Sequence, residues 1–160
     1  TTAKKKTHPL KTIKILCRNK YFILITLAFA VIYTSLGLTG GSRIYYAKYV
    51  LGDEMLNSTM TMFNYIPTIL TIMLIPVFTK RFGKIKALFV GFLFYAAGLV
   101  LEIAGPVNLP MIYTGLVLQG IGHAALYSCL FAIVGDVVDY SEWKDGIREE
   151  GLTYLSLIHI

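Results

Sequence analysis

The sequence has 160 residues, of which 56% are hydrophobic and only 15% are charged, whereas a soluble globular domain is about 45–50% apolar and about 25% charged. The formal net charge is +6, but the basic residues bracket long apolar runs and form no basic–aromatic surface pattern, which argues against a nucleic-acid-binding protein. The composition therefore excludes an ordinary soluble domain and predicts a protein embedded in a membrane.

Four apolar stretches are long enough to cross a bilayer. A span needs about 20 residues, because a helix rises ~1.5 Å per residue and the hydrocarbon core is ~30 Å thick. The first stretch, Tyr21–Val50, contains Gly37, Gly40 and Gly41, so we expect a helix that is weakened there and continues to the far interface.

The remaining spans follow in chain order: about Ser58–Thr79 with kinks at Pro67 and Pro76, about Ala87–Ala104, and about Met111–Val134 with an extension to Tyr140. Leu152 begins a fifth apolar segment. The predicted fold is an all-α, polytopic membrane helix bundle of four complete transmembrane helices and the start of a fifth. Because the sequence lacks an initiator Met and ends inside that segment, we expect a fragment of a longer protein.

Lysine and arginine are distributed unequally between the two sides of these spans. Thirteen of the fifteen precede the first span, separate the second from the third, or follow the fourth, and the other two are Arg43 and Lys48. Because short cytoplasmic loops are rich in basic residues, the N-terminus is predicted to be cytoplasmic. Near the opposite interface, Arg43, Lys48 and Tyr49 match a belt of snorkelling and aromatic side chains.

Polar residues inside a membrane span are candidates for function. In the fourth span Gln119, His123 and Tyr127 are spaced four apart and share a helix face. Amides, imidazoles and phenols can pair with sugar hydroxyls, and an aromatic ring can cover an apolar sugar face. The alternative is that these side chains hydrogen-bond to neighbouring helices.

The second span carries a polar stripe, in which Asn64 and Tyr65 are the candidates for lining a cavity. Its threonines, among them Thr61 and Thr68, are expected to bond to their own helix backbone and to support packing. In the first span Gly37 and Gly41 form a Gly-x-x-x-Gly pair, which permits close approach of a second helix.

The most distinctive stretch is charged and follows the fourth span. Residues 141–151 are predicted to form a loop, while Asp136 and Asp139 share a helix face just before it. Carboxylates at a helix C-terminus oppose the helix dipole, so a basic partner such as Arg148 is expected. The sequence contains no catalytic set and no metal-ligand cluster, so no enzyme, metal or cofactor is predicted.

This stretch resembles a known family. Residues 136–146, followed by 148–151, are similar to the hallmark after the tenth helix of glycoside-pentoside-hexuronide:cation symporters, the melibiose permease-like family of the major facilitator superfamily. Residues 45–53 resemble the end of that family's seventh helix. Residues 80–84 resemble the basic loop between the eighth and ninth helices of major facilitator transporters.

The resemblance implies a twelve-helix fold in which these spans are helices seven to ten of the C-terminal half. It implies uptake of a glycoside, pentoside or hexuronide with Na⁺ or H⁺ by alternating access. The coupling cation would be bound mainly by an N-terminal half that is absent here, and the last two helices would also be partners. Tyr127 would lie near the sugar, and the cytoplasmic gate charges would be Asp136, Asp139, Glu142 and Arg148.

The predicted organisation is a basic cytoplasmic segment between the two halves at 1–20, a membrane region at 21–154, and a truncated or foreign tail at 155–160. The sequence leaves two other functions open. A small oligomeric four-helix exporter would normally carry a buried carboxylate in an early span, and the first span has none. A scaffold or partner-binding subunit has no need for the inward polar face at Gln119, His123 and Tyr127.

Overall fold

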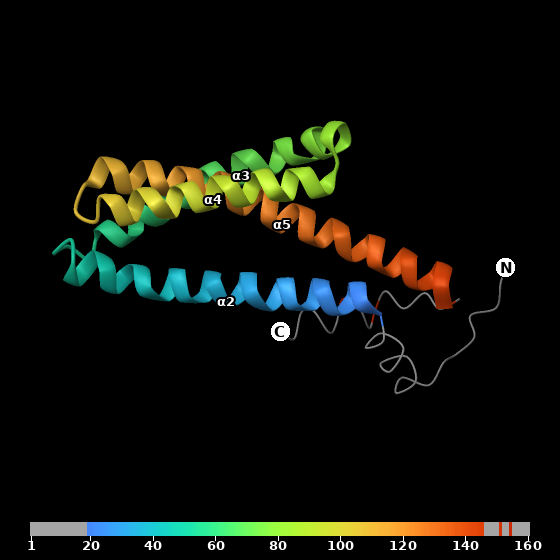
Figure 1. Ribbon diagram of the computed structural model, residues 1–160. Helices are drawn as coiled ribbons and strands as arrows, with labels where there is room; N and C mark the ends of the chain where they lie inside the picture. The colour runs from blue at the N-terminus through green and yellow to red at the C-terminus, as the bar shows by residue number, and fades with distance from the viewer. Residues whose placement is uncertain (1–18, 146–150, 152–153, 155–160) are drawn as a thin grey trace. The chain divides into compact units, whose positions relative to one another are not determined.

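A computed structural model of the chain describes residues 19–145, 151 and 154 (Figure 1). It contains four long helices: α2 (Lys20–Tyr49), α3 (Leu56–Phe82), α4 (Lys84–Ala104) and α5 (Leu109–Asp145). All four are long and apolar enough to cross a membrane. The prediction of an all-α bundle with four spans is therefore confirmed. Residues 1–18 of the predicted basic segment at 1–20, the tail at 155–160, and the predicted fifth span apart from Tyr154 lie outside the described residues.

Three helices, α3, α4 and α5, are longer than the predicted spans, whereas α2 matches the predicted length and is shifted by one residue. α2 has 30 residues and runs without a break through its three glycines, and α3 likewise runs through Pro67 and Pro76. The prediction that a loop begins at Ser141 was wrong, because α5 continues to Asp145. Residues 141–145 contain neither glycine nor proline, and the first residue that disfavours a helix is Gly146.

The described chain divides into two compact units, which we describe separately. The first joins the beginning of α2, up to Thr34, with the end of α5 from Ala132. There the Asn19 Nδ2 donates a hydrogen bond of 2.8 Å to the Ser141 Oγ, and the rings of Tyr21 and Tyr140 meet edge to face at 4.8 Å. The apolar side chains buried here are Phe22, Ile25, Phe29, Val134, Val137 and Val138.

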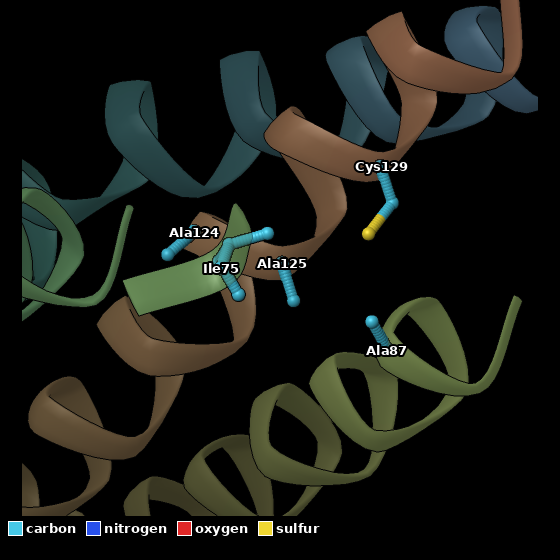
Figure 2. Packing of buried hydrophobic residues seen from close by; sticks show 5 residues of the cluster. All are labelled: Ile75, Ala87, Ala124, Ala125 and Cys129. Atoms are coloured by element: carbon cyan, nitrogen blue, oxygen red, sulfur yellow. The ribbon is translucent and has the colours of Figure 1, made fainter. Parts of the chain in front are cut away.

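The second unit, Ser35–Phe131, holds two apolar clusters. Figure 2 shows one of them, in which Ala125 and Cys129 of α5 point toward the helix that carries Ala87. The thiol of Cys129 is buried and forms no disulfide. The second cluster joins Ala47 at the end of α2 to Met60, Ile112 and Leu116. In the first cluster the side chains that α4 and α5 contribute are small, so these two helices can approach closely.

α4 and α5 approach closely along a row of glycines that we call the glycine seam: Gly91 and Gly98 on α4, and Gly115 and Gly122 on α5. A Cβ atom added at Gly115 would lie 2.7 Å from the Gly98 carbonyl oxygen, and one added at Gly122 would lie 2.6 Å from that of Gly91. Within each helix the two glycines are seven residues apart, about two turns, so they recur on the same face. The seam sets the register of this antiparallel pair.

The Gly-x-x-x-Gly pair of α2 behaves differently. A Cβ atom at Gly37 or Gly41 would meet no heavy atom of another residue within 4 Å in the described part of the chain. The close approach that this motif permits is therefore not made there. Two small residues remove a steric obstacle, but they supply no attraction of their own.

Candidate functional site

The polar row of α5 lies against the glycine seam. Gln119 is completely buried, and its Cγ lies 2.7 Å from the position of a Cβ atom added at Gly98. The ring of His123, 5% exposed, lies 4.9 Å from the ring of Tyr95 and 5.7 Å from that of Tyr127. The row thus faces α4 at its Gln119 end, and Tyr127 at its other end is only partly buried.

Several polar atoms of this row have unused hydrogen-bonding capacity. Among the described residues, neither Oε1 nor Nε2 of Gln119 has a hydrogen-bond partner, and neither has Nε2 of His123. A buried donor or acceptor without a partner is costly, more so where no water can replace the partner. Such groups mark either a network that is completed by another molecule or one that changes its pairing during function.

The polar stripe of α3 serves mainly to join α3 to α5. The Asn64 Nδ2 donates a hydrogen bond of 3.2 Å to the Leu116 carbonyl oxygen, and the Thr68 hydroxyl lies 2.8 Å from the Asn64 carbonyl oxygen and 3.0 Å from that of Gly120. The prediction that the threonines bond to their own helix is confirmed for Thr68, and also for Thr61, which donates to the Asn57 oxygen. Tyr65 is 56% exposed.

Sequence reasoning missed one acidic residue, Glu102. It lies in the last turn of α4, and its Cγ is 3.2 Å from the position of a Cβ atom added at Gly115. The Gln119 amide lies beside its carboxyl group, although neither amide atom reaches hydrogen-bond geometry. The signal was available, because Glu102 is the single acidic residue among the 21 of α4.

Arg43 is the basic counterpart of this acid. Its guanidinium interacts electrostatically with both Glu102 and His123, although it belongs to α2. Its side chain is only partly buried. The sequence analysis predicts an interfacial position for Arg43, and it did not anticipate the electrostatic interaction with the polar row. The second unit therefore gathers Arg43, Glu102, Gln119 and His123, which come from three different helices.

The predicted gate charges lie at the end of α5 in the first unit. Asp136, Asp139 and Glu142 are exposed, and each of them interacts with another group. Arg148, their expected basic partner, lies outside the described residues. The 37 residues of α5 give a contour of about 55 Å, so this end extends past a ~30 Å hydrocarbon core that begins near Leu109. These charges can therefore remain in water.

The described residues contain no group of three or more His, Cys, Asp or Glu side chains that could hold a metal ion. The second unit instead offers groups that can recognise a polar ligand. The guanidinium and the amide can donate hydrogen bonds, the carboxyl group can accept them, and the imidazole can donate or accept. Aromatic rings lie beside these groups.

Comparison with known proteins places the chain in a family. The family model described as "MFS/sugar transport protein" matches residues 1–158. The "Putative sulfoquinovose importer" of Salmonella typhimurium is 32% identical over 92% of this chain and 32% of its own length. The glucuronide carrier protein homolog of Escherichia coli is 29% identical over 91% of the chain and 32% of its own length.

The isoprimeverose transporter of Lactiplantibacillus pentosus is 27% identical over 95% of the chain and 32% of its own length. The chain thus spans about a third of the length of these relatives. No solved structure matches it. With four membrane-spanning helices and a family match along almost the whole sequence, the chain is a multi-pass membrane protein that belongs to the MFS/sugar transport protein family.

Proposed function

We propose that the protein that contains this chain imports a glycoside, pentoside or hexuronide together with Na⁺ or H⁺ by alternating access. The family match supports the transport of a sugar, and relatives are named for sulfoquinovose, a glucuronide and isoprimeverose. In a twelve-helix fold, α2 to α5 would be helices seven to ten. The N-terminal half would supply the main cation site, as the family resemblance implies.

The observation that carries this proposal is the polar row of α5. A membrane helix has no structural need for a buried amide and imidazole with unused atoms, because apolar side chains would fill the same space at lower cost. We assign Tyr127, His123 and Gln119 to the substrate path, with Tyr127 covering an apolar sugar face. Asn64 and Tyr65 complete the proposed lining, Asn64 by holding α3 on the carbonyl of Leu116.

The other proposed part of the mechanism is a gate at the end of α5. Asp136, Asp139 and Glu142 would pair with basic groups, among them Arg148, when the substrate site opens to the opposite side. Their exposure supports this role, since charges that pair and separate in turn must remain close to water. The basic N-terminal segment and the α3–α4 turn support a cytoplasmic location for this end.

The test is uptake by the product of the complete reading frame that contains this chain. In membrane vesicles, labelled glycosides, pentosides and hexuronides are offered with an imposed Na⁺ or proton gradient. We expect gradient-dependent accumulation of at least one of them. Tyr127→Ala should raise the half-saturation concentration about tenfold, which corresponds to about 1.4 kcal/mol of lost contact.

The matched control is Tyr49→Ala, because Tyr49 is 73% exposed at the end of α2 and stacks only on Tyr45 among the described residues. Its half-saturation concentration should remain that of the parent protein. If the folded protein accumulates none of these sugars under either gradient, the proposed function is wrong and a partner-binding role gains weight. Equal effects of the two substitutions would remove Tyr127 from the substrate path.

A further inference from the structure

Tyr95 is the one polar side chain in the middle of α4. From Ala87 to Leu101 every other residue of this helix is apolar or glycine. The three phenylalanines of α4 are between 38% and 68% exposed, whereas Tyr95 is partly buried. A polar group inside a membrane span is a candidate for function. Tyr95 therefore differs from its aromatic neighbours both in chemistry and in the side of α4 that it occupies.

The glycine seam fixes the position of Tyr95 on α5. A Cβ atom added at Gly122 would lie 2.7 Å from the Tyr95 nitrogen and 2.8 Å from the Tyr95 Cβ, so the backbone of Tyr95 passes directly against this glycine. Gly122 precedes His123, and the rings of Tyr95 and His123 meet with their centroids 4.9 Å apart and their planes tilted by 40°. Tyr127, one turn further along α5, has its ring 5.7 Å from the same imidazole. His123 thus has a tyrosine ring beside it from each of the two helices.

The imidazole that these rings hold has an unused nitrogen. His123 is only 5% exposed, and its Nε2 has no hydrogen-bond partner among the described residues. Rotation about the side-chain bonds of His123 would change the direction of Nε2, and rings packed beside the imidazole restrict that rotation. Tyr127 belongs to the same helix as His123, whereas Tyr95 ties the imidazole to α4. Tyr95 therefore sets the direction of Nε2 relative to a second helix.

We propose that Tyr95 is a positioning residue for substrate recognition, whose ring holds the His123 imidazole so that Nε2 pairs with one hydroxyl group of the sugar. This inference rests on the proposed function and adds a residue of α4 to the substrate path. A neutral imidazole nitrogen either donates a hydrogen bond to a hydroxyl group or accepts one from it. A ring that is already held in place loses less freedom when the sugar binds, which favours binding.

This role predicts selectivity for a single hydroxyl group. A buried polar group that pairs with a hydroxyl rejects an analogue that lacks it, because the polar group is then left unpaired. We expect the parent protein to bind one monodeoxy sugar about tenfold more weakly than the complete sugar. Without the Tyr95 ring the imidazole can turn away, so this discrimination should fall about three- to tenfold. A residue that only packs α4 against α5 would weaken all these sugars alike.

The experiment measures exchange of labelled for unlabelled sugar by the complete protein in proteoliposomes, with unlabelled competitors. The competitors are methyl glucoside, methyl xyloside and methyl glucuronide, each with its monodeoxy analogues. His123→Ala should abolish discrimination at one hydroxyl group and so identify it. Tyr95→Leu and Tyr95→Met, which remove the ring, should lower discrimination at that same hydroxyl, and Tyr95→Phe should keep it. The matched control is Phe92→Leu, a 55% exposed aromatic of the same helix, which should change no ratio.

Each discrimination ratio compares two sugars within one variant, so it does not depend on how much folded protein that variant yields. Unchanged ratios in Tyr95→Leu and Tyr95→Met, or an equal weakening of every sugar, would overturn the inference and leave Tyr95 a packing residue. A loss in Tyr95→Phe as large as in Tyr95→Leu would also overturn it, because the phenol hydroxyl would then carry the role. Full discrimination in His123→Ala would remove His123 from the substrate path. In these three outcomes the parent still exchanges sugar, whereas absence of any exchange by the parent would refute the proposed function itself.

Discussion

Gly122→Ala tests whether the α4–α5 register depends on the glycine seam. A Cβ atom at this position would lie 2.6 Å from the Gly91 carbonyl oxygen, 2.7 Å from the Tyr95 nitrogen and 2.8 Å from the Tyr95 Cβ. Ordinary contact begins at 3.4 Å, so the helices would have to separate by 0.8 Å, the difference between 3.4 and 2.6 Å. The atoms in the way belong to the backbone or are next to it, and no side-chain rotation removes them.

The expected cost is about 1–3 kcal/mol, the range for overpacking of a close-packed interior. Alanine also favours a helix over glycine by about 1 kcal/mol, which partly hides that cost. Gly40→Ala is the matched control, since it carries the same helix preference but meets no heavy atom within 4 Å. The difference between the two variants therefore isolates the clash.

The assay is reversible denaturant unfolding of the complete protein in detergent micelles, followed by helix signal and by a probe of tertiary contact. Gly122→Ala should have a free energy of unfolding about 1–3 kcal/mol below that of Gly40→Ala. Equal stability of the two variants would refute the reasoning, because it would mean that α4 and α5 do not approach as closely as the seam requires.

Two further contacts can be tested in the same way. Asn64→Ala removes the hydrogen bond from Asn64 to the Leu116 oxygen. It should lower the free energy of unfolding by about 0.6–1.7 kcal/mol, the range for hydrogen bonds between membrane helices. An unchanged free energy of unfolding would mean that this bond does not hold α3 to α5. A double-mutant cycle of Asn19→Ala and Ser141→Ala should give a coupling energy of about 0.5–1.5 kcal/mol, and strictly additive effects would show that these side chains do not interact.

The main features of the fold follow from local sequence. A span is recognisable because the bilayer requires about 20 apolar residues in a row, and each stretch satisfies this independently of the others. The positions of the helix ends were predicted less accurately. A loop was predicted from Ser141, but the charged segment continues α5 to Asp145. Charge alone does not end a helix in water, and residues 141–145 contain neither glycine nor proline.

The candidate site was only partly predictable. Four-residue spacing showed that Gln119, His123 and Tyr127 share a face, but not which neighbour that face meets. Glu102 was overlooked, and Arg43 was interpreted as an interfacial residue. Each lies near a helix end, where a charge can usually reach water. Their coupling arises from two residues that are 59 positions apart in the sequence, and no periodicity within one helix contains that information.

The sequence by itself determined the four spans, the membrane class and the family resemblance, because hydrophobic length and local motifs are properties of continuous segments. Only the tertiary structure decided that the α5 row faces the glycine seam at Gln119, that Gly37 and Gly41 meet no neighbour in the described chain, and that Glu102 lies beside the row. These facts depend on the register between helices. That register is set by which side chains can come within contact distance, and it exists only once the helices have packed.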